Sequence, residues 1–409
     1  MGNSSLEANE LEKIISKSHK KIALLDANCF YVSCERLFNP KMKKRPTVVL
    51  SNNDGCIIAR SPEVKEMGIK MGQPLFKLDK DVEKNLIKFS SNYHLYGDIS
   101  DRIANILKKY TKSLEVYSID ESFMDLSHIP TEKLNEFCLS IKTEIWRLTG
   151  IPISIGIGPN KTLAKLCNHI AKSKQDFGGV CSYWEIDNID GIDVDEVWGI
   201  GSKWKQKLTL LNVSKIGEFK SLLSAQIKKM FTVVGLRTWM ELHEYLVHDI
   251  ETEFKKPKVV TSSRSFGRTV WQKDQVLDSI WTFLEDATEK LKLEELKAKS
   301  ISLFVTTDRF EENYFVWSKK YRLYNPTNDI SQIWNEIVRL FDDLPTRLWA
   351  KAGVIFYHLV PDELEEPRIF TETFEEVERP KISQQSWLTR RDYLSPKLTT
   401  DWNDIPKIH

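Results

Sequence analysis

Short apolar runs alternate with helical patterns along the first half of the chain. Residues 22–25 form a continuous apolar run typical of a fully buried strand, and Asp26 follows at its end. Two further apolar runs, residues 114–119 and 123–126, fit the arms of a hairpin. The alternation continues to about residue 170, so this half of the chain is predicted to form an α+β domain.

The hydrophobic pattern changes twice in the second half of the chain. Residues 194–256 have a mainly helical period, and residues 255–258 have the composition of a linker. Over residues 259–360, strands alternate with amphipathic helices, which we expect at residues 280–296 and 330–341. Because 409 residues are too many for one core, the chain should divide into about two to four domains.

The composition is that of a soluble globular protein, with 41% hydrophobic and 29% charged residues. No stretch is long and apolar enough to span a membrane, and residues 1–10 lack the apolar core of a signal peptide. A myristoylation signal is not supported, because Leu6 stands where Ser or Thr is required. We therefore expect a cytoplasmic protein that does not associate with membranes.

The six cysteines suggest neither a zinc site nor a disulfide framework. Their positions (29, 34, 56, 138, 167 and 181) show no C-x-x-C spacing and no nearby histidine pattern. We expect free thiols in a reducing compartment.

Three carboxylates stand where predicted strands end or turn. Asp26 follows the first strand, and Asp120 and Glu121 lie between the arms of the hairpin. Neighbouring side chains on a regular strand point to opposite faces, so Asp120 and Glu121 can reach one site only across a turn. Carboxylate oxygens are ligands that Mg²⁺ prefers, and two such ions about 3.5–4 Å apart serve phosphoryl transfer. The acidic residues therefore predict a nucleotidyl transferase. The alternative is that Asp26 is a turn residue or a helix cap, which is equally plausible for Asp26 alone, and that Asp120 and Glu121 form a solvated hairpin tip.

The segments around these carboxylates resemble known motifs. Residues 26–33 (DANCFYVS) and 117–123 (YSIDESF) closely resemble the metal-binding motifs of Y-family DNA polymerases, which copy past damaged template bases. Residues 48–60 (VVLSNNDGCIIAR) resemble specifically the UmuC branch, the catalytic subunit of bacterial DNA polymerase V. The resemblance covers nearly the whole chain except the first twenty or so residues, through residues 89–96, 161–165, 197–201, 263–267 and 394–400.

This resemblance implies a right-hand polymerase fold of the α+β class, with palm, small fingers, a helical thumb that contains a helix-hairpin-helix, and an α/β little finger. The expected boundaries are 1–20 for an N-terminal extension, 21–45 and 79–190 for the palm, 46–78 for the fingers, 191–256 for the thumb, 257–361 for the little finger and 362–409 for a C-terminal tail with a UmuC-type end. The implied activity is error-prone, translesion DNA synthesis in the SOS response to DNA damage.

The resemblance implies a role for the residues nearest the carboxylates. The ligands of two magnesium ions would be Asp26, Asp120, Glu121 and the backbone carbonyl of Ala27. Tyr31, which follows Phe30 next to the sugar of the incoming nucleotide, would be the steric gate that excludes a ribose 2′-hydroxyl. An aromatic pair after a strand is otherwise more often core packing.

Three cations are also implied in nucleotide binding. Lys65 and Lys165 would contact the triphosphate, and Arg60 would stack near the nascent base pair unless it is simply solvated. Many family members carry Tyr and Arg three residues apart where this chain has Pro62 and Lys65. A point charge in place of a bidentate guanidinium predicts weaker nucleotide binding.

Four residues are implied in DNA binding. Gly199 and Gly201 would let the backbone approach a phosphate closely, and Lys203 follows at the start of a predicted helix whose amides can donate to that phosphate. A lone Gly-x-Gly is otherwise often only the end of a helix. Arg264 would pair with the template backbone at the start of the little finger, the alternative being a charged strand edge. The formal net charge is only +1, but phosphate binding depends on the local distribution of charge.

The implied partners are primer-template DNA, deoxynucleoside triphosphates, a processed UmuD-like dimer and the RecA recombinase. Docking to a sliding clamp is in doubt, because residues 365–370 (EEPRIF) keep only the apolar ending of a clamp-binding peptide and lack its glutamine. Two rival classes remain, namely a cyclase-like enzyme acting on free nucleotides and a non-catalytic regulator of recombinase filaments or replication. The first would not need a thumb and little finger, and the intact carboxylates argue against the second.

Overall fold

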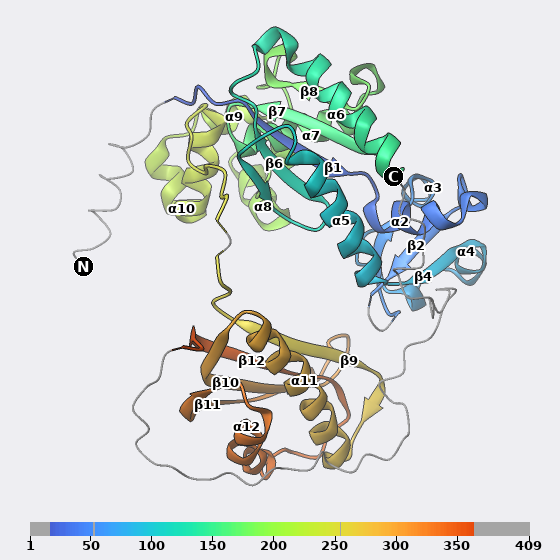
Figure 1. Cartoon of the computed structure of the whole chain (residues 1–409), viewed down its shortest axis with the longest axis vertical. Helices are drawn as coiled ribbons and strands as arrows, with labels where there is room; N and C mark the ends of the chain where they lie inside the picture. Colours follow the sequence, from blue (N-terminus) through green and yellow to red (C-terminus); the bar gives the residue numbers. More distant parts are fainter. Residues whose placement is uncertain (1–16, 52–53, 254, 364–409) are drawn as a thin grey trace.

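The computed structural model describes residues 17–51, 54–253 and 255–363. Three sequence predictions lie outside these residues: most of the N-terminal extension, the segment at 365–370 and the UmuC-type end. Figure 1 shows the last part of the described chain, coloured yellow to red, as a body of its own that an extended segment joins to the rest.

A five-stranded sheet forms the centre of the first part of the chain, in the order β5-β6-β1-β7-β8. β7 and β8 are parallel, and the other neighbours are antiparallel. The strands are β1 (Ile22–Ala27), β5 (Leu114–Val116), β6 (Glu121–Asp125), β7 (Ile153–Gly158) and β8 (Val180–Ser182). The predicted strand at residues 22–25 and the predicted hairpin are both confirmed, because β1 covers the first and β5 pairs with β6.

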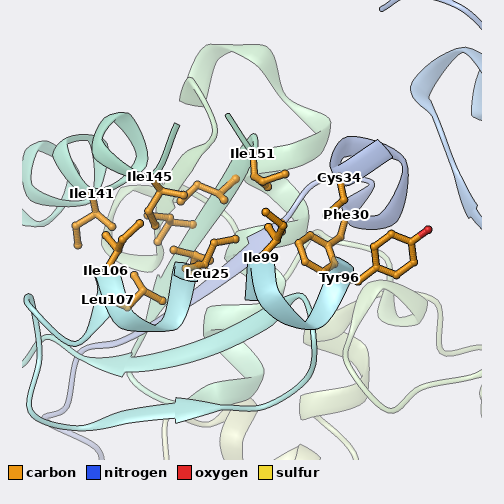
Figure 2. Packing of buried hydrophobic residues seen from close by; sticks show 14 of the residues in the cluster. Leu25, Phe30, Cys34, Tyr96, Ile99, Ile106, Leu107, Ile141, Ile145 and Ile151 are labelled. Atoms are coloured by element: carbon orange, nitrogen blue, oxygen red, sulfur yellow. The ribbon is translucent and has the colours of Figure 1, made fainter. Parts of the chain in front are cut away.

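Helices cover both faces of this sheet. α5 (Tyr93–Leu107) and α6 (Leu134–Thr149) lie on the face to which β1 contributes Leu25, and their buried side chains form one apolar cluster (Figure 2). α7 (Lys161–Ser173) lies on the other face, where its Ala164 packs with Leu24 of β1. Side chains alternate along a strand, so Asp26 shares the face of α7.

Two glycines let α7 lie very close to β7. A Cβ atom on Gly156 would meet the backbone nitrogen of Asn168 at 2.0 Å and the carbonyl oxygen of Ala164 at 2.2 Å. A Cβ atom on Gly158 would meet the nitrogen of Ala164 at 2.7 Å. The buried Asn168 side chain bonds the helix to the sheet, because its Nδ2 donates to the carbonyl oxygen of Ser154 at 2.8 Å.

A smaller, three-stranded sheet has the order β3-β2-β4. β2 (Thr47–Leu50) pairs antiparallel with β3 (Ile57–Arg60) and parallel with β4 (Ile87–Ser90). The helices of this region are α2 (Phe30–Phe38), α3 (Pro62–Glu66) and α4 (Lys80–Asn85). The boundary expected between residues 78 and 79 falls within the stretch that forms this sheet, since β4 lies beyond it.

The region after residue 191 is helical up to Leu242, as the hydrophobic period predicts, but the predicted end at residue 256 is wrong, because the described residues between Leu242 and residue 256 form no helix. Its helices are α8 (Ser202–Leu210), α9 (Ile216–Lys220) and α10 (Ser224–Leu242). The turn at residues 199–201 follows a single 3-10 turn, η6 (Val194–Glu196), so the first helix of the expected helix-hairpin-helix is very short. The buried Glu241 of α10 is tied to the start of α7, because Thr162 N donates to its Oε2 at 3.2 Å and Asn160 Nδ2 donates to its carbonyl oxygen at 2.7 Å.

The last part of the described chain is a four-stranded antiparallel sheet in the order β11-β10-β12-β9, with helices against one face (Figure 1). Its elements are β9 (Val260–Val270), α11 (Lys273–Leu293), β10 (Leu296–Thr306), β11 (Val316–Thr327), α12 (Ile330–Ile337), η7 (Val338–Phe341) and β12 (Trp349–Pro361). The helix predicted at residues 280–296 is α11, which both begins and ends earlier than predicted, because its polar first turn shows no apolar period and Leu296 already belongs to β10. The helix predicted at 330–341 is α12 continued by η7.

The remaining 3-10 turns are η1 (Pro40–Met42), η2 (Leu75–Lys77), η3 (Thr131–Lys133), η4 (Gln175–Phe177) and η5 (Tyr183–Glu185). Within the residues described, no helix is long and apolar enough to cross a membrane. The six cysteines all belong to the described residues and are free thiols, as predicted. Burial raises the pKa of Cys138 to about 12, which keeps this thiol protonated and unreactive.

The close approach of α7 generates a stability prediction. Gly156→Ala should destabilise the protein by about 3 kcal/mol, because the added methyl group meets backbone atoms that cannot rotate away. The matched control is Gly97→Ala in α5, where a Cβ atom meets nothing within 4 Å and alanine favours the helix. Urea unfolding midpoints check this: equal midpoints for the two variants would contradict the packing argument.

Candidate active site

The pairing of β1 with β6 brings the predicted carboxylates together. Asp26 lies directly opposite Glu121 in the antiparallel register, so the two side chains rise from the same face of the sheet. Asp120 occupies the turn before β6, and its carbonyl oxygen accepts a hydrogen bond from Ala27 N at 2.9 Å. The Ser118 hydroxyl donates to Asp120 Oδ1 at 2.7 Å. Both Glu121 and Asp120 lie close enough to Asp26 to raise its pKa, so the turn directs both neighbouring acidic residues towards Asp26.

A row of lysines on α7 faces acidic residues of the sheet. Lys172 Nζ lies 2.5 Å from Asp26 Oδ2, and Lys165 Nζ lies 3.0 Å from Glu121 Oε2. Earlier on the helix, Lys161 Nζ pairs with Glu115 Oε2 of β5 at 2.5 Å. Sequence reasoning singled out Lys165 but missed Lys161 and Lys172, which the helical spacing of four and then seven residues places on the same side.

The carboxylate of Asp26 is largely removed from water and lies close to other charged side chains. Burial raises the pKa of Asp26 to about 6, and the nearby carboxylates of Glu121 and Asp120 act in the same direction. The Lys172 ammonium opposes this shift, because it favours the ionised carboxylate. Perturbed carboxylates of this kind are common at functional sites.

The donor atoms fit a hard divalent cation, but the side chains are not arranged around one metal position. Carboxylate oxygens and a backbone carbonyl are the donors that Mg²⁺ accepts. In the parts of the chain that the structure describes, no three His, Cys, Asp or Glu side chains form a group that could hold one ion. Two of the three carboxylates are instead held by Lys172 and Lys165.

Lys165 is also enclosed by two aromatic rings. Its Nζ lies 4.9 Å from the ring centre of Tyr117 and 4.5 Å from that of Trp198, distances at which a cation is attracted to the ring face. Tyr117 belongs to the turn of the hairpin, and Trp198 directly precedes Gly199. The side chain therefore links the five-stranded sheet to the helical region after residue 191.

Tyr31 lies beside the carboxylates at the start of α2. The chain leaves β1 and turns sharply at Cys29, whose φ of 48° is left-handed, before α2 begins at Phe30. Tyr31 is half-buried, and burial raises its pKa to about 12, with smaller effects from Tyr93 and Asp120. Its hydroxyl is therefore protonated at neutral pH, and its ring is near the acidic site.

The two predicted nucleotide contacts of the smaller sheet lie apart from this group. Arg60 is on β3, and its Nη1 donates to the carbonyl oxygen of Ile69. Lys65 is exposed on the short helix α3. The structure thus brings Lys165 to the carboxylates, whereas Arg60 lies on the three-stranded sheet and Lys65 on helix α3.

The predicted DNA contacts lie on the last two regions of the chain. Gly199 has a φ of 92°, a left-handed conformation that favours glycine, and Gly201 directly precedes α8. Lys203 is exposed in the first turn of that helix. Arg264 is half-buried on β9 opposite Ala352, in the alternating set of residues that faces the helices.

Sequence reasoning missed a basic stretch on the other face of the four-stranded sheet. Lys320 and Arg322 are exposed on β11, where they alternate with Tyr321 and the buried Leu323 of the helix-covered face. Lys351 of β12 lies 5.7 Å above the ring of Phe304. The signal in the sequence is the period-two alternation of residues 316–324, which places Lys320 and Arg322 on one face.

The chain matches three family models. The impB/mucB/samB family matches residues 25–169, and the C-terminal domain of the same family matches residues 257–367. A domain of unknown function matches residues 379–408.

Curated relatives match most of the chain. Protein UmuC of Salmonella typhimurium is 32% identical, covering 94% of this chain and 99% of UmuC. Protein MucB of Escherichia coli is 31% identical, covering 94% of this chain and 98% of MucB. DNA polymerase IV 2 of Bacillus subtilis is 26% identical over 86% of this chain and 87% of its own length.

Solved structures confirm the predicted fold class. A chimera of the Y-family DNA polymerases Dbh and Dpo4 has a TM-score of 0.69 at 22% identity, covering 83% of this chain and 99% of the chimera. An insertion ternary complex of Dbh DNA polymerase has a TM-score of 0.56 at 22% identity, covering 82% of this chain and 98% of that chain. The chain therefore belongs to the impB/mucB/samB family, in its UmuC branch, and has the fold of the Y-family DNA polymerases.

Proposed function

We propose that this chain is a template-directed DNA polymerase of the error-prone, translesion type, which extends a primer 3′ end with deoxynucleotides in the SOS response to DNA damage. The observation that carries the proposal is the pairing of Asp26 with Glu121 across β1 and β6, with Asp120 in the adjoining turn. Membership of the family that includes UmuC supports the same activity, and the fold is consistent with it.

Two magnesium ions would bind at the carboxylates. Asp26, Asp120 and Glu121, with the backbone carbonyl of Ala27, are the oxygen donors that we propose as ligands. When bound, the ions would activate the primer 3′-hydroxyl and stabilise the departing pyrophosphate. Asp26 and Glu121, which pair with Lys172 and Lys165 in this structure, would then bind the metal ions in place of these lysines.

The incoming deoxynucleoside triphosphate would bind beside α2 and α7. The amides at the start of α2, a nine-residue helix, lie at the positive end of its dipole and suit a phosphate group. Lys165 and Lys65 would add positive charge, which stabilises the charge that develops in phosphoryl transfer. Arg60 would stack near the nascent base pair. Tyr31 would lie under the sugar and exclude a 2′-hydroxyl, with Phe30 beside it.

Primer-template DNA would be held by the last two regions. The amides and Lys203 at the start of α8, after Gly199 and Gly201, would bind phosphate without reading the bases. Lys320 and Arg322 on the open face of the four-stranded sheet would attract the DNA phosphates independently of sequence. Arg264 would contact the template backbone at the edge of this sheet. The five-stranded sheet would then be the palm, the three-stranded sheet the fingers, α8 to α10 the thumb, and the four-stranded sheet the little finger.

The family relationship to UmuC also supports two protein partners, a processed UmuD-like dimer and the RecA recombinase. No contact within the described residues identifies a surface for either. A non-catalytic regulator remains the alternative, and primer extension by the purified chain distinguishes the two, with the partners added in a second series.

Removing one carboxylate should abolish synthesis. Asp120→Ala should lower the rate of primer extension by roughly a thousandfold or more, because a metal site contributes several kcal/mol to phosphoryl transfer. The matched control is Asp101→Ala, which removes an exposed carboxylate of α5. Binding of primer-template DNA, followed by fluorescence anisotropy, should be nearly unchanged in both variants. Extension by Asp120→Ala at the rate of the control would refute the assignment of the metal ligands.

Removing charge from the open face of the four-stranded sheet should weaken DNA binding at low salt. The double variant Lys320→Ala/Arg322→Ala should reduce the slope of log K against log salt concentration by about 1.8 if both side chains contact duplex phosphates. Lys290→Ala/Lys292→Ala removes two exposed cations from α11, on the other side of the sheet, and should leave the slope unchanged. Equal slopes for both variants would show that DNA does not bind this face.

A further inference from the structure

The ring of Tyr31 rests on a second tyrosine. Tyr96 of α5 stacks on it, with ring centres 4.3 Å apart and an interplanar angle of 14°. Tyr96 is 0% exposed, whereas Tyr31 is half-buried. One face of the Tyr31 ring is therefore covered by a side chain that belongs to the core.

Tyr96 is itself held by the helix that carries Tyr31. Its hydroxyl donates to Glu35 Oε1 at 2.7 Å, and Glu35 is a buried carboxylate, 6% exposed, four residues after Tyr31 on α2. Burial and the Glu35 charge raise the pKa of Tyr96 well above its usual range, so the hydroxyl stays a donor. The three side chains form a closed arrangement in which α2 holds α5 through Glu35 and α5 supports Tyr31 through Tyr96.

Further rings limit sideways movement. Tyr93 packs edge to face against Tyr31, with ring centres 6.0 Å apart and an interplanar angle of 89°. The ring centre of Phe30, the preceding residue, lies 5.9 Å from that of Tyr31. Figure 2 shows Phe30 and Cys34 of α2 beside Tyr96 at one end of the apolar cluster between the five-stranded sheet and its helices. The support for Tyr31 is thus continuous with the apolar core of the domain.

We propose that Tyr96 and Glu35 are positioning residues that set the selectivity of Tyr31 for deoxyribonucleotides over ribonucleotides. This inference rests on the proposed polymerase activity and on the role of Tyr31 as steric gate. Neither residue need touch the nucleotide. Their effect is to keep the Tyr31 ring from moving down into the core when a 2′-hydroxyl presses against it.

The selectivity of a steric gate depends on how easily its ring can be displaced. A gate excludes a hydroxyl only if moving the ring costs more than the incoming nucleotide gains by binding. Protein cores are close-packed, so a ring that is stacked on a fully buried ring has no space to move into. The bond from Tyr96 to the buried Glu35 adds to this, because displacing Tyr96 would break a hydrogen bond to a desolvated carboxylate.

The test measures sugar selectivity, defined as the ratio of kcat/KM for a deoxynucleotide to that for the matching ribonucleotide. The full-length chain is used, with a primer-template and, if synthesis requires them, the partner proteins. Tyr96→Leu should lower the ratio by about tenfold, equivalent to about 1.4 kcal/mol, through faster ribonucleotide incorporation. Deoxynucleotide incorporation should change by less than about threefold. Tyr96→Phe keeps the ring but not the hydroxyl, so its ratio should lie between those of Tyr96→Leu and the unaltered chain.

Tyr110→Leu is the matched control. The Tyr110 hydroxyl also donates to a carboxylate, that of Glu144, and its ring packs on Phe137 in the same apolar cluster, away from Tyr31. This variant should lose stability without a change in sugar selectivity. An equal fall in selectivity for Tyr110→Leu would mean that general loosening of the domain is responsible, and the positioning role would be wrong.

Tyr31→Ala separates this inference from the proposal on which it rests. A lower ratio for Tyr31→Ala with an unchanged ratio for Tyr96→Leu would refute the positioning role and leave the gate intact. An unchanged ratio for Tyr31→Ala would refute the gate itself. If Tyr96→Leu does not fold, Tyr96→Phe decides, since it retains the buried ring: a ratio equal to that of the unaltered chain would then overturn the role of Glu35 and of the hydroxyl.

Discussion

The close approach of α7 to β7 is the constraint on which the rest of the site depends. The helix can lie so near the sheet only because Gly156 and Gly158 carry no side chain where its backbone passes. At this distance the lysines along one side of α7 reach acidic residues of three different strands, β5, β6 and β1. One packing contact therefore sets the position of three ion pairs, and a displaced helix would disturb all of them together.

Charge balance explains why lysines and acidic residues occur as matched partners here. A carboxylate removed from water is costly unless a cation or hydrogen-bond donor compensates it. Asp26 still has a raised pKa despite Lys172, which shows that burial and two neighbouring carboxylates outweigh one ammonium group. A site of this kind attracts further positive charge. The same lysines that stabilise the folded protein would, in the proposed polymerase, be available to a phosphate group once the carboxylates bind other cations.

Aromatic packing restricts two side chains that are proposed to contact the nucleotide, just as the lysines of α7 hold the carboxylates in place. Tyr117 and Trp198 enclose Lys165, and Tyr96 supports Tyr31. In each case a side chain with a proposed role is limited to one position by neighbours from another element. Such restriction lowers the entropy that must be lost when a substrate binds, which is the general advantage of preorganised sites.

The sequence by itself determined the local elements and the family. The run at residues 22–25 and the hairpin around Asp120 are local patterns, and the motifs around them identify the relatives. It did not reveal Lys172 or the cations of β11, because a lysine in a site and a lysine on a solvated face have the same local pattern. Only the tertiary structure decided that Asp26 lies opposite Glu121 and that Tyr96 lies under Tyr31. Both contacts join segments far apart in the chain, and they depend on strand register and helix packing, which no local periodicity encodes.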